Sequence, residues 1–414
     1  MEKGTPDMSE KFKSEPTEIA GLSVLAHKIA DDAWETTNFA RSHTPPLGDF
    51  GDGVMWALYE PLGMYSDAVV RRYDANHENC RGIGVNLNRT AWMYHDQEAR
   101  NYAALNANVI GLENLDPASY SDTAPAPGLA NDYENPARYV APESVKLDPP
   151  ETAAEDIRKI IADEAGWLGD VDDAVKAVTK WSALEEVIKP ISGNWNELKR
   201  IGESHKIAGE AMEKCGKNLE AGAEQVTGHW SGKAEESFQD YARRQVESMK
   251  WEGPVGRLTK EALDAAGTEI QDACIEVVRQ LADLLAKEVE GDSIKSLVKL
   301  LAKKIPVVGT SYQAWAVYDI IMSVKERVEQ LVAQVQGIVD AIKSFLEPLI
   351  AMNDSANAIS EETLGPIAER VRDTRRKVEI GVDIKAAADA DGPLHRPDED
   401  YSPGAGTEPW EDAA

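Results

Sequence analysis

The chain has 414 residues, enough for two or three domains with a sizeable core, and a formal net charge of −29 at pH 7. So large an acidic excess argues against nucleic acid as a partner, because phosphate binding needs clustered lysine and arginine. The three cysteines, Cys80, Cys215 and Cys274, lack metal-ligand spacing and imply no disulfide framework. The chain shows no metal-binding or cofactor-binding motif, so we expect neither a metal nor a cofactor.

The first 16 residues are polar and charged, and we expect them to be disordered. They lack the apolar segment of a secretory signal peptide. The protein is therefore expected to stay in the cytoplasm, or to leave it by a route that needs no such peptide.

Residues 17–111 are predicted to form a helical hairpin. Apolar residues at helical spacing indicate a first helix over 17–43, which ends in a loop rich in proline and glycine. A second helix over about 61–108 would be about 70 Å long, which suits a bundle better than a globule. Its core-facing stripe consists of Leu62, Tyr65, Val69, Asn76, Ile83, Leu87 and Tyr94.

Residues 112–150 are predicted to be a linker. They contain seven of the 21 prolines and show little periodicity. An extended chain is therefore expected, because proline-rich segments adopt extended conformations without packing into regular elements.

Residues 151–350 are predicted to form a longer helical domain with a second hairpin inside it. Two helices, 194–227 and 232–290, flank a turn, and a break is expected at Glu252-Gly253-Pro254 because proline disrupts a helix interior. The stripe of the first helix recurs at spacings of four and three, which keeps one face toward a partner helix. Its members are Ile201, His205, Ala208, Met212, Cys215, Leu219, Gly222 and Val226. We interpret His205 as a polar residue inside the core.

The turn between these two helices carries the sequence Trp230-Ser231-Gly232. Gly228 suits the left-handed residue that often follows a helix end. Ser231 can cap the next helix, whose first turn is acidic, as the helix dipole favours. We expect the indole of Trp230 to close the end of the bundle, where the glycine lets the chain reverse.

Residues 294–324 have two interpretations. A basic amphipathic helix over 294–304 leads into residues 305–324, which hold one charge and are long enough to span a membrane. Proline, glycine and polar residues within this second part favour a buried bundle helix, and contact with a membrane surface is kept as an alternative. That contact would be made by Lys295, Lys299, Lys303 and Lys304.

The C-terminal part is predicted to be weakly structured, and no catalytic site is found. Residues 351–388 contain a weak helix over about 360–388, and residues 389–414 form a disordered acidic tail. The seven histidines include no His-Glu-x-x-His pair, and the chain has neither a phosphate loop nor a Gly-x-Ser-x-Gly sequence.

Two short motifs resemble those of type VII (ESX) secretion substrates. Trp230-Ser231-Gly232, between two amphipathic helices, is similar to the WXG turn of their helical hairpins. Tyr94 and Glu98, four residues apart on one helical face, resemble the Tyr-x-x-x-Asp/Glu export signal near the end of the second helix of one partner. The alternatives are structural: a packed tryptophan in an ordinary helical turn, and an ordinary surface pair.

The resemblance implies a fused PE/PPE-type substrate, because features that the family divides between two partners occur here in one chain. The repeated apolar stripes and the scarcity of alternating strand patterns predict an all-α fold. With the resemblance, we expect elongated helical hairpins packed as a four-helix bundle with extra C-terminal helices. Helices 17–43 and 61–108 should then pack lengthwise on helices 194–227 and 232–251. Tyr94 and Glu98 should lie on an exposed face within reach of the Trp230 turn.

The function that the resemblance implies is a non-enzymatic effector, cytoplasmic before export and then secreted or held at the cell surface. Its partner would be the type VII secretion ATPase or an export chaperone. A homo-oligomer is left open. Two other classes stay open at this stage: a membrane-active helical effector, and a toxin-type enzyme whose site the sequence does not reveal.

Overall fold

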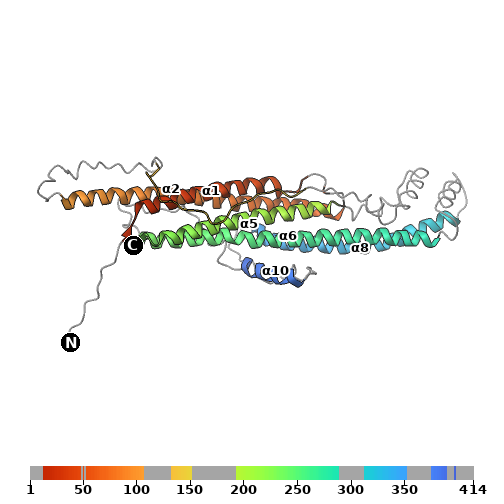
Figure 1. Ribbon diagram of the computed structural model, residues 1–414. Helices are drawn as coiled ribbons and strands as arrows, with labels where there is room; N and C mark the ends of the chain where they lie inside the picture. Colours follow the sequence, from red (N-terminus) through yellow and green to blue (C-terminus); the bar gives the residue numbers. More distant parts are fainter. Residues whose placement is uncertain are drawn as a thin grey trace, which may run out of the picture.

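The computed structural model describes residues 13–47, 50, 53–106, 132–151, 193–288, 312–351, 374–388 and 396–397. Of these, 83% are α-helical, and the sheet that they contain has two strands of two residues each. The all-α class is therefore confirmed. The long helices lie roughly parallel to one axis, which gives an elongated molecule (Figure 1).

The first hairpin has the predicted helices. Helix α1 spans Pro16–His43, and helix α2 spans Tyr59–Asn106 after a short 3-10 helix, η1, at Val54–Leu58. Pro16 occupies the first turn of α1, where its missing N–H and fixed φ cost least. The core-facing stripe of α2 is buried along its length, from Leu62 to Tyr94.

The second hairpin consists of helix α5, Trp195–Val226, and helix α6, Lys233–Glu288. The Asn194 side chain caps α5 by accepting a hydrogen bond from the Glu197 amide at 3.2 Å. The predicted break at residues 252–254 is wrong, because α6 runs through Pro254 without interruption.

Close packing between α5 and α6 explains why the helix tolerates this proline. A Cβ on Gly209 would lie 2.4 Å from the Glu252 carbonyl oxygen and 3.2 Å from the Gly256 Cα, so the two backbones are in contact there. Residues 251–256 are all buried. Burial of this whole stretch offsets the cost of an interior proline, which is about 3 kcal/mol.

The two hairpins pack against each other lengthwise, as predicted. Helix α1 lies along α5, and Leu22 and Leu25 of α1 approach Gly222 of α5. Helix α2 meets α6 through buried polar contacts, among them a hydrogen bond of 2.9 Å between the hydroxyls of Tyr65 and Thr259.

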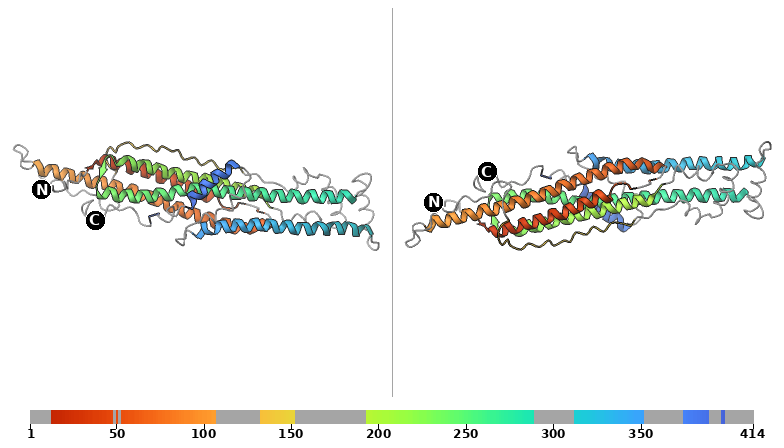
Figure 2. Two further views of the ribbon diagram at one scale, coloured as in Figure 1. Left: turned by 90° about the horizontal axis from the view of Figure 1, so that it is seen from below. Right: turned by 90° about the horizontal axis from the view of Figure 1, so that it is seen from above.

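Two further helices join this core. Helix α8, Tyr312–Ala351, runs beside α6 and continues past the ends of α1 and α5 (Figure 2). Helix α10, Thr374–Ala387, packs on α6, where the Trp251 indole donates to the Ala387 carbonyl at 2.9 Å. The four hairpin helices therefore do not enclose the core by themselves.

The described part of the linker, residues 132–151, is extended as predicted, and it packs on the helices. The Ala137 amide donates to the Thr17 carbonyl at 2.8 Å. Further along, the Asn218 side chain accepts from the Glu143 amide at 2.8 Å and donates to its carbonyl at 3.0 Å. These bonds give an extended backbone the partners that a sheet would otherwise supply.

Several predictions fall on residues outside the described ranges. Lys295, Lys299, Lys303 and Lys304 are among them, as are most of the acidic tail and residues 152–192. Among the described helices, none combines the length and apolar character that a membrane crossing requires. Of the tail, Pro397 accepts a hydrogen bond from the Asn79 amide group at 3.0 Å.

Candidate functional site at the Trp230 turn

The turn after α5 holds its shape through backbone bonds and one left-handed glycine. The His229 amide donates to the Val226 carbonyl at 2.8 Å, and Gly232 has a φ of 119°. Gly228, predicted to be left-handed, is not among the described glycines with positive φ. Because α6 begins at Lys233, Gly232 rather than Ser231 precedes the helix, and its carbonyl accepts from the Glu236 amide at 3.0 Å.

The N-terminal segment forms a strand on this turn. Strand β1, Lys13–Ser14, pairs antiparallel with strand β2, Trp230–Ser231, with Ser14 opposite Trp230. The Glu15 amide donates to the His229 carbonyl at 3.0 Å. The expectation of disorder up to residue 16 is therefore wrong for residues 13–16, since the exposed backbone of the turn offers them a pairing edge.

Trp230 closes the end of the bundle, as predicted. Its side chain is buried, and its ring stacks on Phe238 of α6 with the ring centroids 5.6 Å apart. The ring of Tyr94 of α2 packs edge-to-face with the same indole, with a centroid distance of 6.2 Å. The indole Nε1 donates to the Tyr94 hydroxyl at 3.3 Å, so this buried polar group has a partner.

The predicted exposure of Tyr94 is wrong, whereas its predicted nearness to Trp230 is correct. Only 2% of Tyr94 is accessible, because the ring lies on the core-facing stripe of α2 and covers the indole. Burial raises the pKa of Tyr94, and the hydrogen bond from Trp230 acts in the opposite direction. Glu98, one turn further along α2, is exposed as predicted.

The outer face of α2 near Glu98 is bordered by the extended segment. The Tyr133 hydroxyl lies 3.0 Å from Nδ1 of His95, and its ring centroid is 4.9 Å from that of Trp92. Burial and the charges of Glu98 and Asp96 raise the pKa of Tyr133. The exposed carboxylate of Glu98 therefore lies beside a cluster of Trp92, His95 and Tyr133, which α2 and the extended segment form together.

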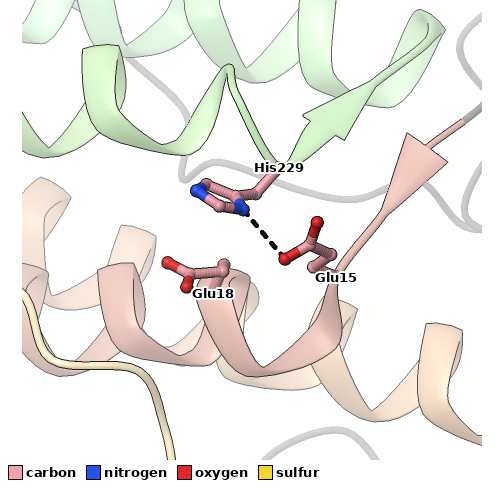
Figure 3. Close-up of side chains that lie close together, drawn as sticks. All are labelled: Glu15, Glu18 and His229. Atoms are coloured by element: carbon pink, nitrogen blue, oxygen red, sulfur yellow. Dashed lines mark hydrogen bonds and ion pairs between the residues drawn. The ribbon is translucent and has the colours of Figure 1, made fainter.

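Beside the same turn, two carboxylates and an imidazole come together. His229 Nδ1 lies 2.8 Å from Glu15 Oε2, and one ligand atom from each of Glu15, Glu18 and His229 falls within 4.8 Å of the others (Figure 3). Hydrogen bonds from Lys13 and His229 lower the pKa of Glu15. Sequence reasoning missed this group because 214 positions separate Glu15 from His229 and no pattern links them.

His205 is a buried core residue, as predicted. Its ring centroid lies 4.6 Å from that of Tyr65, and its Nε2 has no hydrogen-bond partner in the described structure. Burial, together with the nearby charges of Arg72 and Arg200, lowers its pKa to about 3, so the imidazole is neutral near pH 7.

Comparison with protein-family models, with curated protein sequences and with solved structures gives no match. The resemblance to type VII substrates therefore depends on the two motifs and on the order of the helices.

Proposed function

We propose that this chain is a non-enzymatic protein exported by a type VII secretion system, with the Trp230 turn and the end of α2 as its export signal. The contact between Trp230 and Tyr94 carries the proposal. These residues are 136 positions apart, and each belongs to one of the two motifs. In the family that the motifs resemble, the two features come from separate partners.

The contact makes one composite signal out of two segments. Tyr94 is buried, so a secretion ATPase would not bind its hydroxyl directly. Its role would be to position the turn, because its ring and hydroxyl hold the Trp230 indole in place. Recognition would then fall on Glu98 and on the exposed residues Thr227 and Gly228 of the turn.

The position of Glu98 suits such a role. Helix α2 continues past the Trp230 turn, so its last turns project beyond the body of the bundle (Figure 1). A charge there is accessible to a partner, whereas the apolar core of the bundle is covered. Before export the protein would be cytoplasmic, and afterwards secreted or held at the cell surface.

The test is secretion of a Glu98→Gln variant from a host with an active type VII system. Glutamine keeps the size of the side chain and removes its charge, and exposed substitutions usually change stability by about 0.5 kcal/mol or less. We expect folded protein that is retained in the cell. Glu78→Gln is the matched control, because Glu78 is also exposed on α2 but lies 20 residues before Glu98, about 30 Å along the helix at about 1.5 Å per residue.

A Tyr94→Phe variant separates positioning from recognition. It keeps the ring that covers Trp230 and removes the hydroxyl that accepts from the indole, so export should fall less than in Glu98→Gln. Circular dichroism establishes that each variant is folded. Export of folded Glu98→Gln at the level of the unmodified protein and of Glu78→Gln would show that the motif match arose by chance.

A further inference from the structure

The group formed by Glu15, Glu18 and His229 has the donor set of a metal site. Two carboxylates come from the start of α1, and the imidazole comes from the turn after α5, so the fold brings three side chains from different parts of the chain close together (Figure 3). All three residues are partly buried. Such a mixed set of oxygen and nitrogen donors is typical of divalent transition metals.

The distances agree with this chemistry. Donor atoms around a tetrahedral zinc ion, with bonds of about 2.1 Å, lie about 3.4 Å apart. Here the pair His229 Nδ1 and Glu15 Oε2 is 2.8 Å apart, and all three donors lie within 4.8 Å of one another. Small side-chain rotations would bring them to equal distances from a common centre.

A second observation concerns Glu18 itself. Its Oε2 atom is buried and has no hydrogen-bond partner in the described structure. A buried carboxylate oxygen without a partner is costly, and a bound cation is one of the few groups that would satisfy it. Burial raises the pKa of Tyr139, and the charge of the nearby Glu18 raises it further, so the Tyr139 hydroxyl, itself without a hydrogen-bond partner in the described structure, is another polar group beside this carboxylate.

We propose that Glu15, Glu18 and His229 bind a divalent transition-metal ion of the zinc class, with water completing the coordination. The imidazole favours zinc over magnesium or calcium, which prefer six or more oxygen ligands. The proposal is independent of export, because it concerns only the ligands and their geometry.

Some charges near the site disfavour a bound cation, and others favour it. The positive end of α1 and the Lys13 ammonium, 2.9 Å from Glu15 Oε1, disfavour it. Two carboxylates and a protein charge of −29 favour it. Lys13 occupies the Oε1 atom of Glu15, which leaves Oε2 for the metal.

A bound ion would join strand β1 and the start of α1 to the Trp230 turn. Metal that binds only the folded state raises stability with the logarithm of its concentration over the dissociation constant, once that concentration exceeds the constant. We therefore expect the melting temperature of the full chain to rise with added zinc.

The experiment is isothermal titration of the full-length protein with zinc chloride, compared with His229→Gln and Glu18→Gln variants. Loss of a ligand should weaken binding by at least about tenfold, since even the partners that orient metal ligands contribute about 10–100-fold. His95→Gln is the control, because it removes an exposed histidine beside acidic residues of α2. Circular dichroism shows that the variants are folded.

Binding of one zinc per chain that both variants lose and His95→Gln keeps would support the site. The proposal is overturned if zinc does not bind, or if it binds equally to the two ligand variants. It is also overturned if magnesium binds as tightly as zinc and the His229→Gln variant binds both ions with unchanged affinity, because binding would then require only an acidic surface.

Discussion

The buried ion pair between Arg72 of α2 and Glu252 of α6 allows a sharp prediction about what holds the helices together. The guanidinium binds the carboxylate twice, at 2.7 and 3.1 Å, and both side chains are 3% exposed or less. A third bond of 3.3 Å reaches the Leu349 carbonyl of α8, and the Trp251 ring lies 5.3 Å from the guanidinium carbon. One side chain thus joins three helices.

Removing one charge should be far more damaging than removing both. Burial lowers the pKa of Arg72, but the charge and hydrogen bonds of Glu252 more than reverse this, so Arg72 stays charged. Glu252→Gln leaves that charge without its counter-ion, and breaking a buried pair costs about 3–5 kcal/mol. Arg72→Met should cost a similar amount, because it leaves the Glu252 carboxylate in the same position.

The double variant Arg72→Met, Glu252→Leu should recover most of that loss. Replacing a buried pair by apolar groups of similar volume is often neutral or stabilising by about 1–4 kcal/mol. Urea unfolding of the four proteins gives the coupling energy as a double-mutant cycle. In the single Arg72 variant, amide exchange near the end of α8 should also rise, because the Leu349 carbonyl loses its donor.

Either of two results would show that the Arg72–Glu252 pair does not hold the helices together in this way. One is a single variant that costs less than about 1 kcal/mol, which would mean that water solvates the remaining charge. The other is a double variant as unstable as the sum of the single ones, which would mean that packing alone sets the cost.

Two further predictions concern the α5–α6 hairpin. The pKa of His205 is lowered to about 3 in the folded chain, so below about pH 6.5 the unfolded chain binds a proton that the folded chain does not. The free energy of unfolding should therefore decrease as the pH is lowered from about 6.5, by up to about 1.4 kcal/mol per pH unit. Thermal melts between pH 7 and 4 measure this slope, and a His205→Gln variant with an equal slope would contradict the assignment. Gly209→Ala should destabilise by about 1–3 kcal/mol, because its Cβ would lie 2.4 Å from the Glu252 carbonyl. Gly63→Ala on α2, where a Cβ meets nothing within 4 Å, is the control and should not destabilise in the same urea assay.

The ends of the helices could be predicted from the sequence because the signals for them are local. The helices predicted over 17–43 and 194–227 are observed at Pro16–His43 and Trp195–Val226, so their ends agree to within one residue. An apolar residue every three or four positions defines a buried face, and proline or glycine nearby ends the helix. Burial of Trp230 followed from the same pattern.

Tyr94 shows where two sequence signals disagreed. It belongs to the core-facing stripe of α2, which predicts burial, and to a motif that resembles an exposed export signal. The structure buries it, because the stripe continues until it meets the Trp230 turn. Periodicity describes every residue of the helix, whereas a five-residue motif matches by chance far more often.

In the part of the chain that the structure describes, the sequence by itself determined which segments are helical and which face of each helix is buried. The tertiary structure alone decided what each face meets: Pro254 stays inside α6 because α5 packs closely against it, and residues 13–14 become a strand because the turn offers an edge. The same holds for Glu15, Glu18 and His229, which only folding brings within 4.8 Å. The physical reason is range: helix propensity and amphipathicity act over a few residues. These contacts join positions from 43 apart, as for Gly209 and Glu252, to more than 200 apart, and they depend on how whole helices pack.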